Sequence, residues 1–382
     1  MATALTDLDL LARLVAIDTT SRLPTRPLGD FVAEYLSAPG VRIERFDCGG
    51  EHENMLISAG PECRAGEGLL LCGHVDTVPA DEPEWTSDPR TLIAREDGPS
   101  GRRVVARGAC DMKGFDALAI NLLREASAGE LAEPLQLLLT CNEEVGTLGA
   151  AAFARAWPVG RPLPRRLLVG EPTSMRVVRG HKGHLTISII VHGVAAHSGF
   201  PHKGVNAIER AASAIVAMGE LRVAMTARRN AESSLFPEVP FPVLTTAKVH
   251  GGAAINVIPE RCEIDVGVRL LPGMESAVFM EELRRAVGAV LPANAFEITL
   301  RNETPAFATP PDRAWHTEVC TLVGQTGECG VGFGTDAGRL AGLGVEPVIW
   351  GPGDISNAHK PDEWMPLDEF ESAARLLRRL VR

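Results

Sequence analysis

The sequence contains no apolar stretch that approaches membrane-spanning length, which argues against a membrane-embedded helix. It lacks a basic leader followed by an apolar block, so we expect no signal peptide. Basic residues are the minority, with 38 Lys and Arg against 49 Asp and Glu, and the net charge of −11 argues against a nucleic-acid partner. None of the 8 cysteines forms a CxxC pair, so a disulfide framework is not expected. These features together predict a cytoplasmic protein with no membrane or nucleic-acid partner.

Nucleotide-binding signatures are also missing. The sequence has no P-loop and no strand–GxGxxG–helix unit, which counts against a nucleotide-binding α/β protein. What is present is a chain of 382 residues with 45% hydrophobic content, an ordinary value for a soluble protein. That length exceeds one simple core and suits two domains.

Residues 1–182 alternate short apolar runs with helical periods, a pattern typical of an α/β sheet covered on both faces. The apolar periods predict helices over residues 8–17, 28–36, 114–126 and 147–156, and strands over 41–46, 54–58, 68–73, 135–141 and 166–170.

The pattern changes near residue 183. The elements expected there are, in order, a strand over 184–193, a helix over 206–221, strands over 244–252 and 262–271, a helix over 275–291 and a strand over 296–302. This order predicts an α+β unit of the split βαβ kind. We therefore predict an inserted domain over residues 183–302, while residues 1–182 and 303–382 together form the first domain.

Imidazoles and carboxylates stand where the apolar runs of the first domain end. They are His74 and Asp76 after LLLC, Asp111 after ARGAC, Glu143 and Glu144 after LLLTCN, Glu171 after LLVG, and His359 in the late loop SNAHKPDEW. Ligands of α/β sheets bind beyond the carboxyl ends of the strands, so these side chains are expected to converge. Each one alone is better explained as a turn or surface group, and a Glu-Glu pair before a helix as a favourable charge at its N-terminus.

The combination is harder to explain in that way. Two imidazoles with several carboxylates suit zinc or a similar divalent ion. The carboxylates exceed the number that one ion needs, and a two-metal site with one shared carboxylate uses them all.

Long blocks of the sequence then carry a family resemblance. They are GHVDTVP, ARGACDMKG, CNEEVGTLGA, GEPTSMRVVRGHKGHL, AAHSGFPHKGVNAI, GGAAINVIPERCEIDVGVRLLPG and GPGDISNAHKPDEW. In these blocks, over about residues 54–365, the chain resembles the acetylornithine deacetylase / succinyl-diaminopimelate desuccinylase family of dizinc amidohydrolases, and the acetylornithine deacetylase branch most closely. The resemblance implies a zinc-peptidase-like α/β catalytic domain with an inserted, ferredoxin-like dimerisation domain.

The resemblance also implies a role for each strand-end residue. Asp111 would bridge two metal ions, His74 and Glu171 would complete one site, and Glu144 and His359 the other. Zn²⁺ is the expected ion and Co²⁺ the alternative. Asp76 would lie behind His74 and fix its ring, and the Asp111–Met112 peptide bond would be cis. Glu143 would act as the general base toward the attacking water and then protonate the leaving amine.

Residues of the inserted domain would complete the site. His197 alone is better explained as a turn histidine, but the matching residue of the family reaches from one subunit into the partner's active site and stabilises the oxyanion. Asn256 and Arg269 match residues that hold the substrate's carboxylate, to which Arg can donate two parallel hydrogen bonds. Gly334 and Thr335 would line the pocket near the substrate.

The remaining histidines carry little information. His184 is a weak marker of the acetylornithine branch, and His181 and His192 are best explained as structural histidines.

The resemblance, together with the ligand-type residues at the strand ends, thus implies a homodimeric dizinc amidohydrolase that acts on a small N-acyl amino acid. The expected reaction converts N2-acetyl-L-ornithine and water to acetate and L-ornithine, a step of arginine biosynthesis. The nearest alternatives are N-succinyl-diaminopimelate desuccinylase and a broader aminoacylase or dipeptidase. A binding protein that has lost turnover is a further alternative, and the intact Glu143 argues against it.

Overall fold

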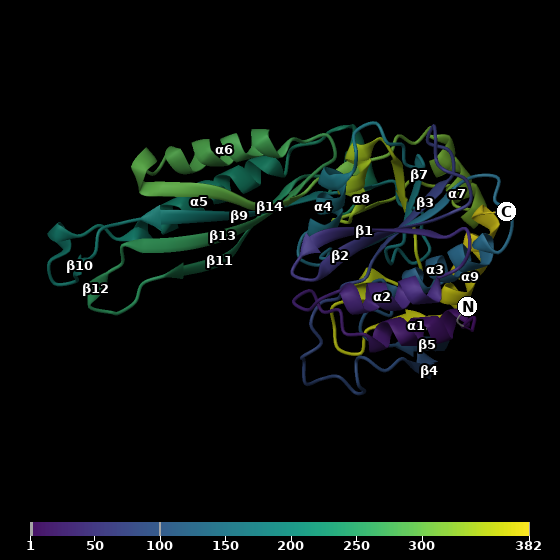
Figure 1. Ribbon diagram of the computed structural model, residues 1–382. Helices are drawn as coiled ribbons and strands as arrows, with labels where there is room; N and C mark the ends of the chain where they lie inside the picture. Colours follow the sequence, from purple (N-terminus) through teal and green to yellow (C-terminus); the bar gives the residue numbers. More distant parts are fainter. Residues whose placement is uncertain (1–2, 99–100, 382) are drawn as a thin grey trace. The chain divides into compact units, whose positions relative to one another are not determined.

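The computed structural model describes residues 3–98 and 101–381, and the chain divides into two compact units. Unit 1 contains residues up to Arg179 together with Thr309–Cys329 and Thr335–Arg382, and unit 2 contains Gly180–Ala308 and Gly330–Gly334. The fold class predicted from the sequence, an α/β unit with an inserted α+β unit, is confirmed (Figure 1). The sequence predicted one continuous insert over residues 183–302. Unit 2 instead consists of two segments, because Gly330–Gly334 joins it in addition to Gly180–Ala308.

Unit 1 is built around a six-stranded sheet in the order β1-β2-β6-β3-β7-β17. Its strands are β1 (Arg42–Gly49), β2 (His52–Ala59), β3 (Leu69–His74), β6 (Leu135–Thr140), β7 (Arg166–Val169) and β17 (Glu346–Ile349). β1 and β2 pair antiparallel, β2 pairs antiparallel with β6, and β6, β3, β7 and β17 run parallel. All residues of β3 and β6 are buried, as expected for parallel strands with helices on both faces.

Helices cover the sheet of unit 1. They are α1 (Asp7–Ala16), α2 (Arg26–Tyr35), α3 (Lys113–Ser127), α4 (Leu148–Ala156), α7 (Ala314–Val323), α8 (Ala337–Leu340) and α9 (Leu367–Leu380). Helix α3 is buried along most of its length and contacts α1, α9 and strands β2, β3 and β6. The 3-10 helices of this unit are η4 (Ala341–Leu343) and η5 (Ile355–Asn357).

A second sheet of unit 1 was missed by the sequence analysis. It has the order β18-β5-β4 and comprises β4 (Ile93–Gly98), β5 (Gly101–Val105) and β18 (Trp364–Pro366). Its strands are short, and β5 begins with the exposed Gly101 and Arg102 before it turns apolar. Too few apolar residues alternate along it to produce a period-two signal.

Unit 2 contains a four-stranded antiparallel sheet in the order β11-β13-β9-β14. Its strands are β9 (Gly183–His192), β11 (Val243–Gly251), β13 (Arg261–Leu270) and β14 (Phe296–Thr304), and its helices are α5 (Ala207–Met225) and α6 (Ser276–Gly288). The insertion of β13 between β9 and β11 is the strand order of a split βαβ unit. Alternate residues of β13 are buried against the helices, and the others lie on the opposite face.

Short elements complete unit 2. They are β8 (Gly180–His181), β10 (Ala196–His197), β12 (Val257–Ile258), β15 (Phe307–Ala308), β16 (Gly330–Val331), η1 (Pro201–Lys203), η2 (Ala231–Leu235) and η3 (Ala293–Ala295). β10 pairs with β12, and Figure 1 draws this pair at one end of the four-stranded sheet.

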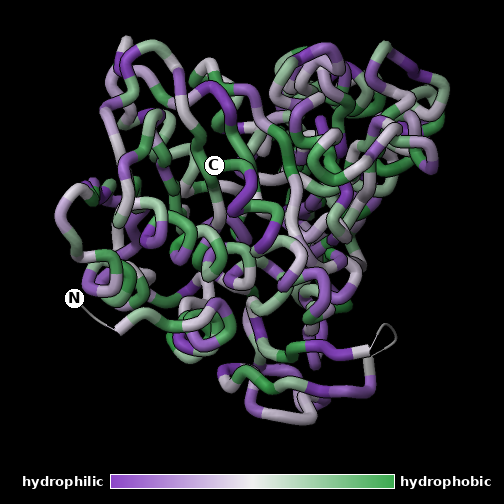
Figure 2. Tube along the Cα trace, turned by 90° about the vertical axis from the view of Figure 1, so that its right-hand side faces the viewer, coloured by the Kyte–Doolittle hydropathy of each residue, from purple (hydrophilic) through white to green (hydrophobic). Residues whose placement is uncertain are grey.

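Apolar and polar residues are interspersed along the trace (Figure 2). Within residues 3–98 and 101–381, no helix combines the length and hydropathy that a membrane span requires.

Candidate metal centre

Four parallel strands of unit 1 end at the same edge of the sheet, where the predicted ligands lie. His74 is the last residue of β3, Glu171 follows β7, Glu144 follows β6, and His359 lies in the loop between β17 and β18. Asp111 stands just before α3, which packs against β3 and β6. Parallel pairing of strands far apart in the sequence therefore brings these side chains to the carboxyl ends of the strands.

Two overlapping groups of ligand atoms form there. One consists of His74, Asp111 and Glu171 and the other of Asp111, Glu144 and His359, each with its ligand atoms within 4.8 Å of one another. His74 Nε2 lies 3.0 Å from Asp111 Oδ1, and His359 Nε2 lies 3.2 Å from Asp111 Oδ2 and 3.0 Å from Glu144 Oε2. The two carboxylate oxygens of Asp111 thus face different imidazoles, as a ligand shared by two ions requires.

The charges of this cluster fit bound cations. Burial, and then the neighbouring Asp111, raise the pKa of Glu171 well above its ordinary value and that of Glu144 to about 7. Burial alone would also raise the pKa of Asp111, but hydrogen bonds from His359 and His74 lower it. Buried carboxylates that repel one another need a positive charge among them. Two imidazoles and three carboxylates are a donor set that zinc and related divalent ions accept.

Asp76 connects two of the loops at this edge. Its Oδ1 accepts the backbone N–H of Glu143 at 3.0 Å, and its Oδ2 accepts that of Glu144 at 3.2 Å and the Ser21 hydroxyl at 3.0 Å. His74 Nδ1 lies 3.0 Å from the backbone carbonyl of Asp76 and 3.8 Å from its Oδ1. The ring is therefore closer to the Asp76 backbone, while the Asp76 side chain holds the Glu143–Glu144 segment.

Glu143 lies beside the cluster without belonging to either group of ligand atoms. Burial and the carboxylate of Glu171 raise its pKa well above the ordinary value. Its backbone carbonyl accepts N–H groups from Gly146 and Thr147, both at 2.8 Å, which fixes the turn before α4. A buried carboxyl group with a raised pKa is suited to proton transfer.

The expected cis peptide bond between Asp111 and Met112 is present.

Two buried acidic residues near the cluster were missed by the sequence analysis. Asp336 accepts a hydrogen bond from the Thr140 hydroxyl at 2.5 Å, and Glu363 accepts the backbone N–H groups of Cys110 and Asp111. The only signal for either was its position, since Asp336 follows Thr335 and Glu363 lies four residues after His359.

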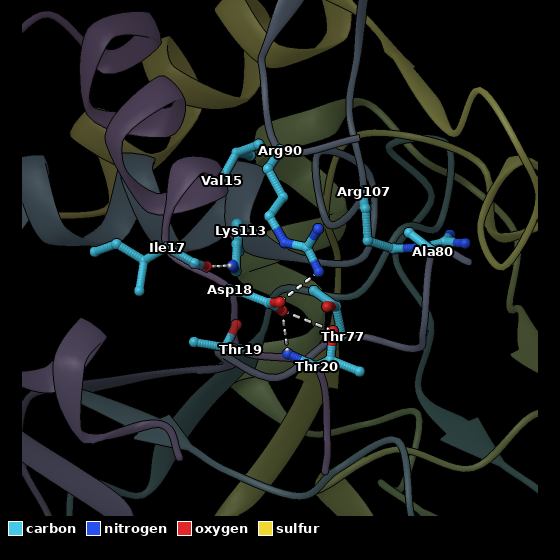
Figure 3. Close-up of a pocket in the computed structure, with 10 residues that line it drawn as sticks. All are labelled: Val15, Ile17, Asp18, Thr19, Thr20, Thr77, Ala80, Arg90, Arg107 and Lys113. Carbon is cyan, nitrogen blue, oxygen red and sulfur yellow. Dashed lines mark hydrogen bonds and ion pairs between the residues drawn. The ribbon is translucent and has the colours of Figure 1, made fainter. Parts of the chain in front are cut away.

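A small cavity in unit 1 is lined by residues of the segment 15–20, which follows from α1, and by Thr77, Arg107 and Lys113 among others (Figure 3). It has a volume of about 10 Å³, which is room for roughly one water molecule, and is not a substrate pocket. Lys113 lines it and donates to the backbone carbonyls of Leu14 and Ile17, both at 3.0 Å. This buried ammonium group ties the start of α3 to the end of α1.

Unit 2 holds the other predicted residues. His197 is exposed on β10, where its Nδ1 accepts a hydrogen bond from the N–H of Gly199 at 3.0 Å. Asn256 is exposed just before β12, where its backbone carbonyl accepts a hydrogen bond from the N–H of Ser198 at 2.9 Å. These two residues lie close together at the β10–β12 pair. Arg269 lies near the other end of β13, eight residues beyond Arg261, which corresponds to about 27 Å of strand.

Arg269 pairs across the sheet with His184. Burial lowers the pKa of Arg269, and burial together with the Arg269 charge lowers that of His184 to about 4. Among the residues that the structure describes, the guanidinium of Arg269 forms no hydrogen bond or ion pair. An unpaired, partly buried guanidinium is suited to bind a carboxylate.

The two residues predicted to line the pocket fall in different units. Gly334 belongs to unit 2, where a Cβ would lie 2.8 Å from Cγ2 of Thr304. Thr335 belongs to unit 1 and is fully buried, and its hydroxyl accepts the N–H of Ala337 at 3.1 Å at the start of α8.

Residues 70–382 match the model of "Peptidase family M20/M25/M40". An acetylornithine deacetylase of Proteus mirabilis is 34% identical over 317 residues, covering 82% of this chain and 79% of that protein. Another from Salmonella typhimurium is 34% identical over 354 residues, covering 92% of this chain and 86% of that protein. The chain belongs to the M20 family. It is a metallohydrolase of that family, as the relatives and the ligand clusters of unit 1 indicate.

Solved structures of M20-type enzymes share the fold. An M20 family metallo-carboxypeptidase from Sulfolobus solfataricus superposes with a TM-score of 0.74 at 17% identity and covers 99% of both chains. The aminopeptidase PepT from Bacillus cereus superposes with a TM-score of 0.73 at 18% identity, covering 98% of this chain and 97% of that one. At these low identities, the two superpositions show that the fold is shared and nothing more.

Proposed function

We propose that this M20 enzyme hydrolyses the N-acyl amide of an amino acid, with N2-acetyl-L-ornithine as the first candidate substrate and acetate and L-ornithine as products. The observation that carries the proposal is the pair of ligand clusters that share Asp111 beside Glu143. The acetylornithine deacetylases that match most of the chain support the choice of substrate. The reaction would supply ornithine for arginine biosynthesis.

Two divalent ions per chain would serve this reaction, with Zn²⁺ as the first choice and Co²⁺ as the alternative. His74 and Glu171 would hold one ion, Glu144 and His359 the other, and Asp111 both. Bound divalent ions lower the pKa of water and polarise an acyl carbonyl.

In this mechanism Glu143 moves the proton. Its carboxylate would take a proton from the attacking water and deliver it to the nitrogen of the leaving amine as the amide bond breaks. Burial keeps the carboxyl group of Glu143 away from bulk water. The hydrogen bonds from the N–H groups of Glu143 and Glu144 to the Asp76 carboxylate orient this segment. Glu144, the next residue, would remain a metal ligand.

Residues of unit 2 would recognise the substrate. Arg269 and Asn256 would hold its α-carboxylate, Gly334 and Thr335 would line the pocket, and His197 would stabilise the oxyanion. Within one unit 2, however, His197 and Asn256 lie at the β10–β12 pair, which leads into the Arg261 end of β13, whereas Arg269 lies about 27 Å of strand beyond Arg261. This separation supports a site to which a second copy contributes His197 and Asn256.

A homodimer would provide that second copy. One face of α5 is exposed although it carries Ile208, Ala212, Val216 and Val223, with Val216 and Val223 each 65% exposed. The edge strand β11 is also exposed over most of its length. An apolar helix face beside an open strand edge favours association with another copy of the chain.

We further propose a cytoplasmic enzyme without a nucleic-acid or membrane partner. The acidic balance of the chain supports this proposal, since nucleic acids and anionic membranes attract basic surfaces.

A substrate panel on one metal-loaded preparation tests the proposal. We expect kcat/KM to be highest for N2-acetylornithine among N2-acetylornithine, N-acetylmethionine, N-succinyl-diaminopimelate and a dipeptide. A lead for the succinyl substrate would favour the desuccinylase, and a lead for acetylmethionine or the dipeptide would favour a broader aminoacylase or dipeptidase. Binding of these compounds without turnover by the loaded enzyme would favour a non-catalytic binding protein.

A further inference from the structure

Two buried carboxylates each accept a pair of consecutive backbone N–H groups from a loop of the metal centre. Asp76 accepts those of Glu143 and Glu144, as described above. Glu363 does the same for the loop before α3, because its Oε1 accepts the N–H of Cys110 at 2.9 Å and that of Asp111 at 3.1 Å. The Asp111 N–H belongs to the residue whose two carboxylate oxygens face His74 and His359.

The second sheet of unit 1 places Glu363 at this position. Glu363 directly precedes β18, and β18 pairs antiparallel with β5 so that Trp364 lies opposite Val105. The backbone carbonyl of Glu363 also accepts the N–H of Ala106 at 3.1 Å. These contacts fix the Glu363 backbone beside the residue that follows β5, and its side chain then reaches the loop before α3.

Arg107 holds the other end of the Glu363 carboxylate. Its Nη1 lies 2.8 Å from Glu363 Oε2, and the Arg107 and Glu363 side chains are only 5% and 1% exposed. The same guanidinium donates to the carbonyl of Pro79 at 3.0 Å and lies 5.1 Å from the centre of the Trp85 ring. One oxygen of the Glu363 carboxylate therefore contacts the guanidinium of Arg107, and the other accepts the two backbone N–H groups.

We propose that Glu363 is a positioning residue of the metal centre, which fixes the peptide segment that presents Asp111 and ties it to the loop that carries His359. The proposal rests on the metal-ligand roles of the proposed function. A shared ligand must direct each oxygen toward a different site, so a small rotation of the Asp111 backbone disturbs both clusters at once. His359 lies only four residues before Glu363, so the same side chain sets the separation of two ligands that approach within 3.2 Å.

A purely structural role for the Arg107–Glu363 ion pair is the alternative. Buried ion pairs can often be replaced by apolar residues without loss of folding stability. Metal affinity separates the two roles, because residues that orient metal ligands typically change affinity by about 10- to 100-fold when replaced.

Two double variants isolate the contribution of the Glu363 oxygen. Arg107→Met with Glu363→Gln removes both charges but keeps an amide oxygen that can accept the two N–H groups. Arg107→Met with Glu363→Met removes the charges and the acceptor, so the two proteins differ in the terminal amide of residue 363, which alone supplies the acceptor oxygen. Glu53→Gln serves as a control, since Glu53 is also a buried partner of an arginine, Arg45 at 2.8 Å, and belongs to neither group of ligand atoms.

The main measurement is calorimetric titration of each metal-free protein with Zn²⁺, which gives the stoichiometry and affinity without reference to turnover. We expect affinity for both ions to fall by about 10- to 100-fold in the Met-Met variant and to remain within about threefold of wild type in the Met-Gln variant and in Glu53→Gln. Equal affinities in the two double variants would overturn the proposal, whatever their melting temperatures.

A second measurement covers the case in which the Met-Met variant does not fold. Backbone amide exchange of the metal-free wild type should show the Cys110 and Asp111 N–H groups protected, and the Met-Gln variant should keep that protection. Rapid exchange at both amides in the wild type would also overturn the proposal.

Wild-type controls distinguish this inference from the proposed function. If the wild type binds two ions but hydrolyses no N-acyl amino acid, the substrate assignment fails, while the affinity comparison still decides the role of Glu363. If the wild type binds no ion at these residues, both proposals fail.

Discussion

Among the residues that the structure describes, the two units differ in the charged groups that they hold without a neutralising partner, which are acidic in unit 1 and basic in unit 2. Unit 1 buries acidic residues of several distant loops together at one edge of a parallel sheet. Unit 2 packs one face of its sheet against α5 and α6, and on the other face carries Arg269, which has no ion-pair partner among the described residues. The buried cluster of unit 1 suits cations, and the unpaired cation of unit 2 suits an anionic group of a substrate.

This difference separates the chemistry from the recognition. In the proposed mechanism the metal ligands and Glu143 all belong to unit 1, while most of the proposed substrate contacts belong to unit 2. A change in unit 1 should therefore act mainly on metal content or kcat, and a change in unit 2, His197 excepted, mainly on substrate binding.

The largest expected effect is that of Glu143→Gln in unit 1. The amide keeps the shape of the side chain but cannot accept the proton, so kcat should fall by roughly 10²- to 10⁴-fold with metal content unchanged. The matched variant is Glu144→Gln, which should instead lower the metal content. Metal analysis and steady-state kinetics of both proteins provide the measurement. If the two variants exchange these effects, the assignment of the neighbouring glutamates is reversed.

Arg269→Ala tests the corresponding residue of unit 2. Removing one partner of a buried, charge-assisted pair costs about 2–5 kcal/mol, so kcat/KM for every α-carboxylate substrate should fall by at least about 30-fold. The two bound ions should remain, because none of their proposed ligands lies in unit 2. Arg301→Ala, which removes an exposed arginine of the same sheet, is the control. A kcat/KM close to that of the wild type for substrates with and without an α-carboxylate would count against the proposed contact.

A smaller effect concerns the pH dependence of stability in unit 1. Asp116 on α3 is 1% exposed, and neither carboxyl oxygen has a hydrogen-bond partner among the described residues. Burial raises its pKa to about 8, far above the value of about 3.9 in an unfolded chain. The folded state therefore binds the extra proton, and this contribution to the free energy of unfolding is complete below about pH 4 and lost as the pH rises through 8.

Asp116→Asn should remove that dependence. Relative to the metal-free wild type, the variant should gain stability progressively between about pH 4 and pH 8, by at most about 1.4 kcal/mol per pH unit, because over this range the wild-type chain releases the proton only when it unfolds. Urea denaturation across this range measures the difference, and the exposed Asp312→Asn controls for the loss of a carboxylate. A constant difference between variant and wild type would show that Asp116 does not retain its proton.

The smallest expected effect has the opposite sign and lies in unit 2. Burial, and then the Arg269 charge, lower the pKa of His184 to about 4, below the ordinary value of about 6.5. The folded state keeps this imidazole neutral, so its contribution to stability is present above about pH 6.5 and lost as the pH falls toward 4.

His184→Asn should weaken the acid dependence of unfolding over that interval, and Arg269→Met should weaken it partly by removing the neighbouring charge. His192→Asn, on the same strand, is the control for loss of an imidazole. Unfolding curves of the three variants between pH 4 and pH 7 check this. Identical acid profiles for His184→Asn and the wild type would remove the contrast between the two units.

Much of the fold was predictable because local patterns carry it. The buried strands β3 and β6 follow largely apolar runs, and α5 and α6 follow helical periods between strands of alternating burial. The sheet of β4, β5 and β18 was missed because these strands are short and carry little alternation. The exposure of α5's apolar face also could not be derived from its period, since the same stripe would serve equally well inside a core.

The sequence by itself determined which residue types stand at the ends of the apolar runs, and hence that carboxylates and imidazoles could meet at one edge of a parallel sheet. Only the tertiary structure decided the strand order that brings His74, Glu144 and Glu171 to that edge. It also decided that Asp76 holds the Glu143–Glu144 segment and that Glu363 reaches the N–H groups of Cys110 and Asp111, about 250 residues earlier in the chain. The physical reason is that local periodicity reports which face of an element is buried, whereas hydrogen bonds between distant loops depend on how the strands pair.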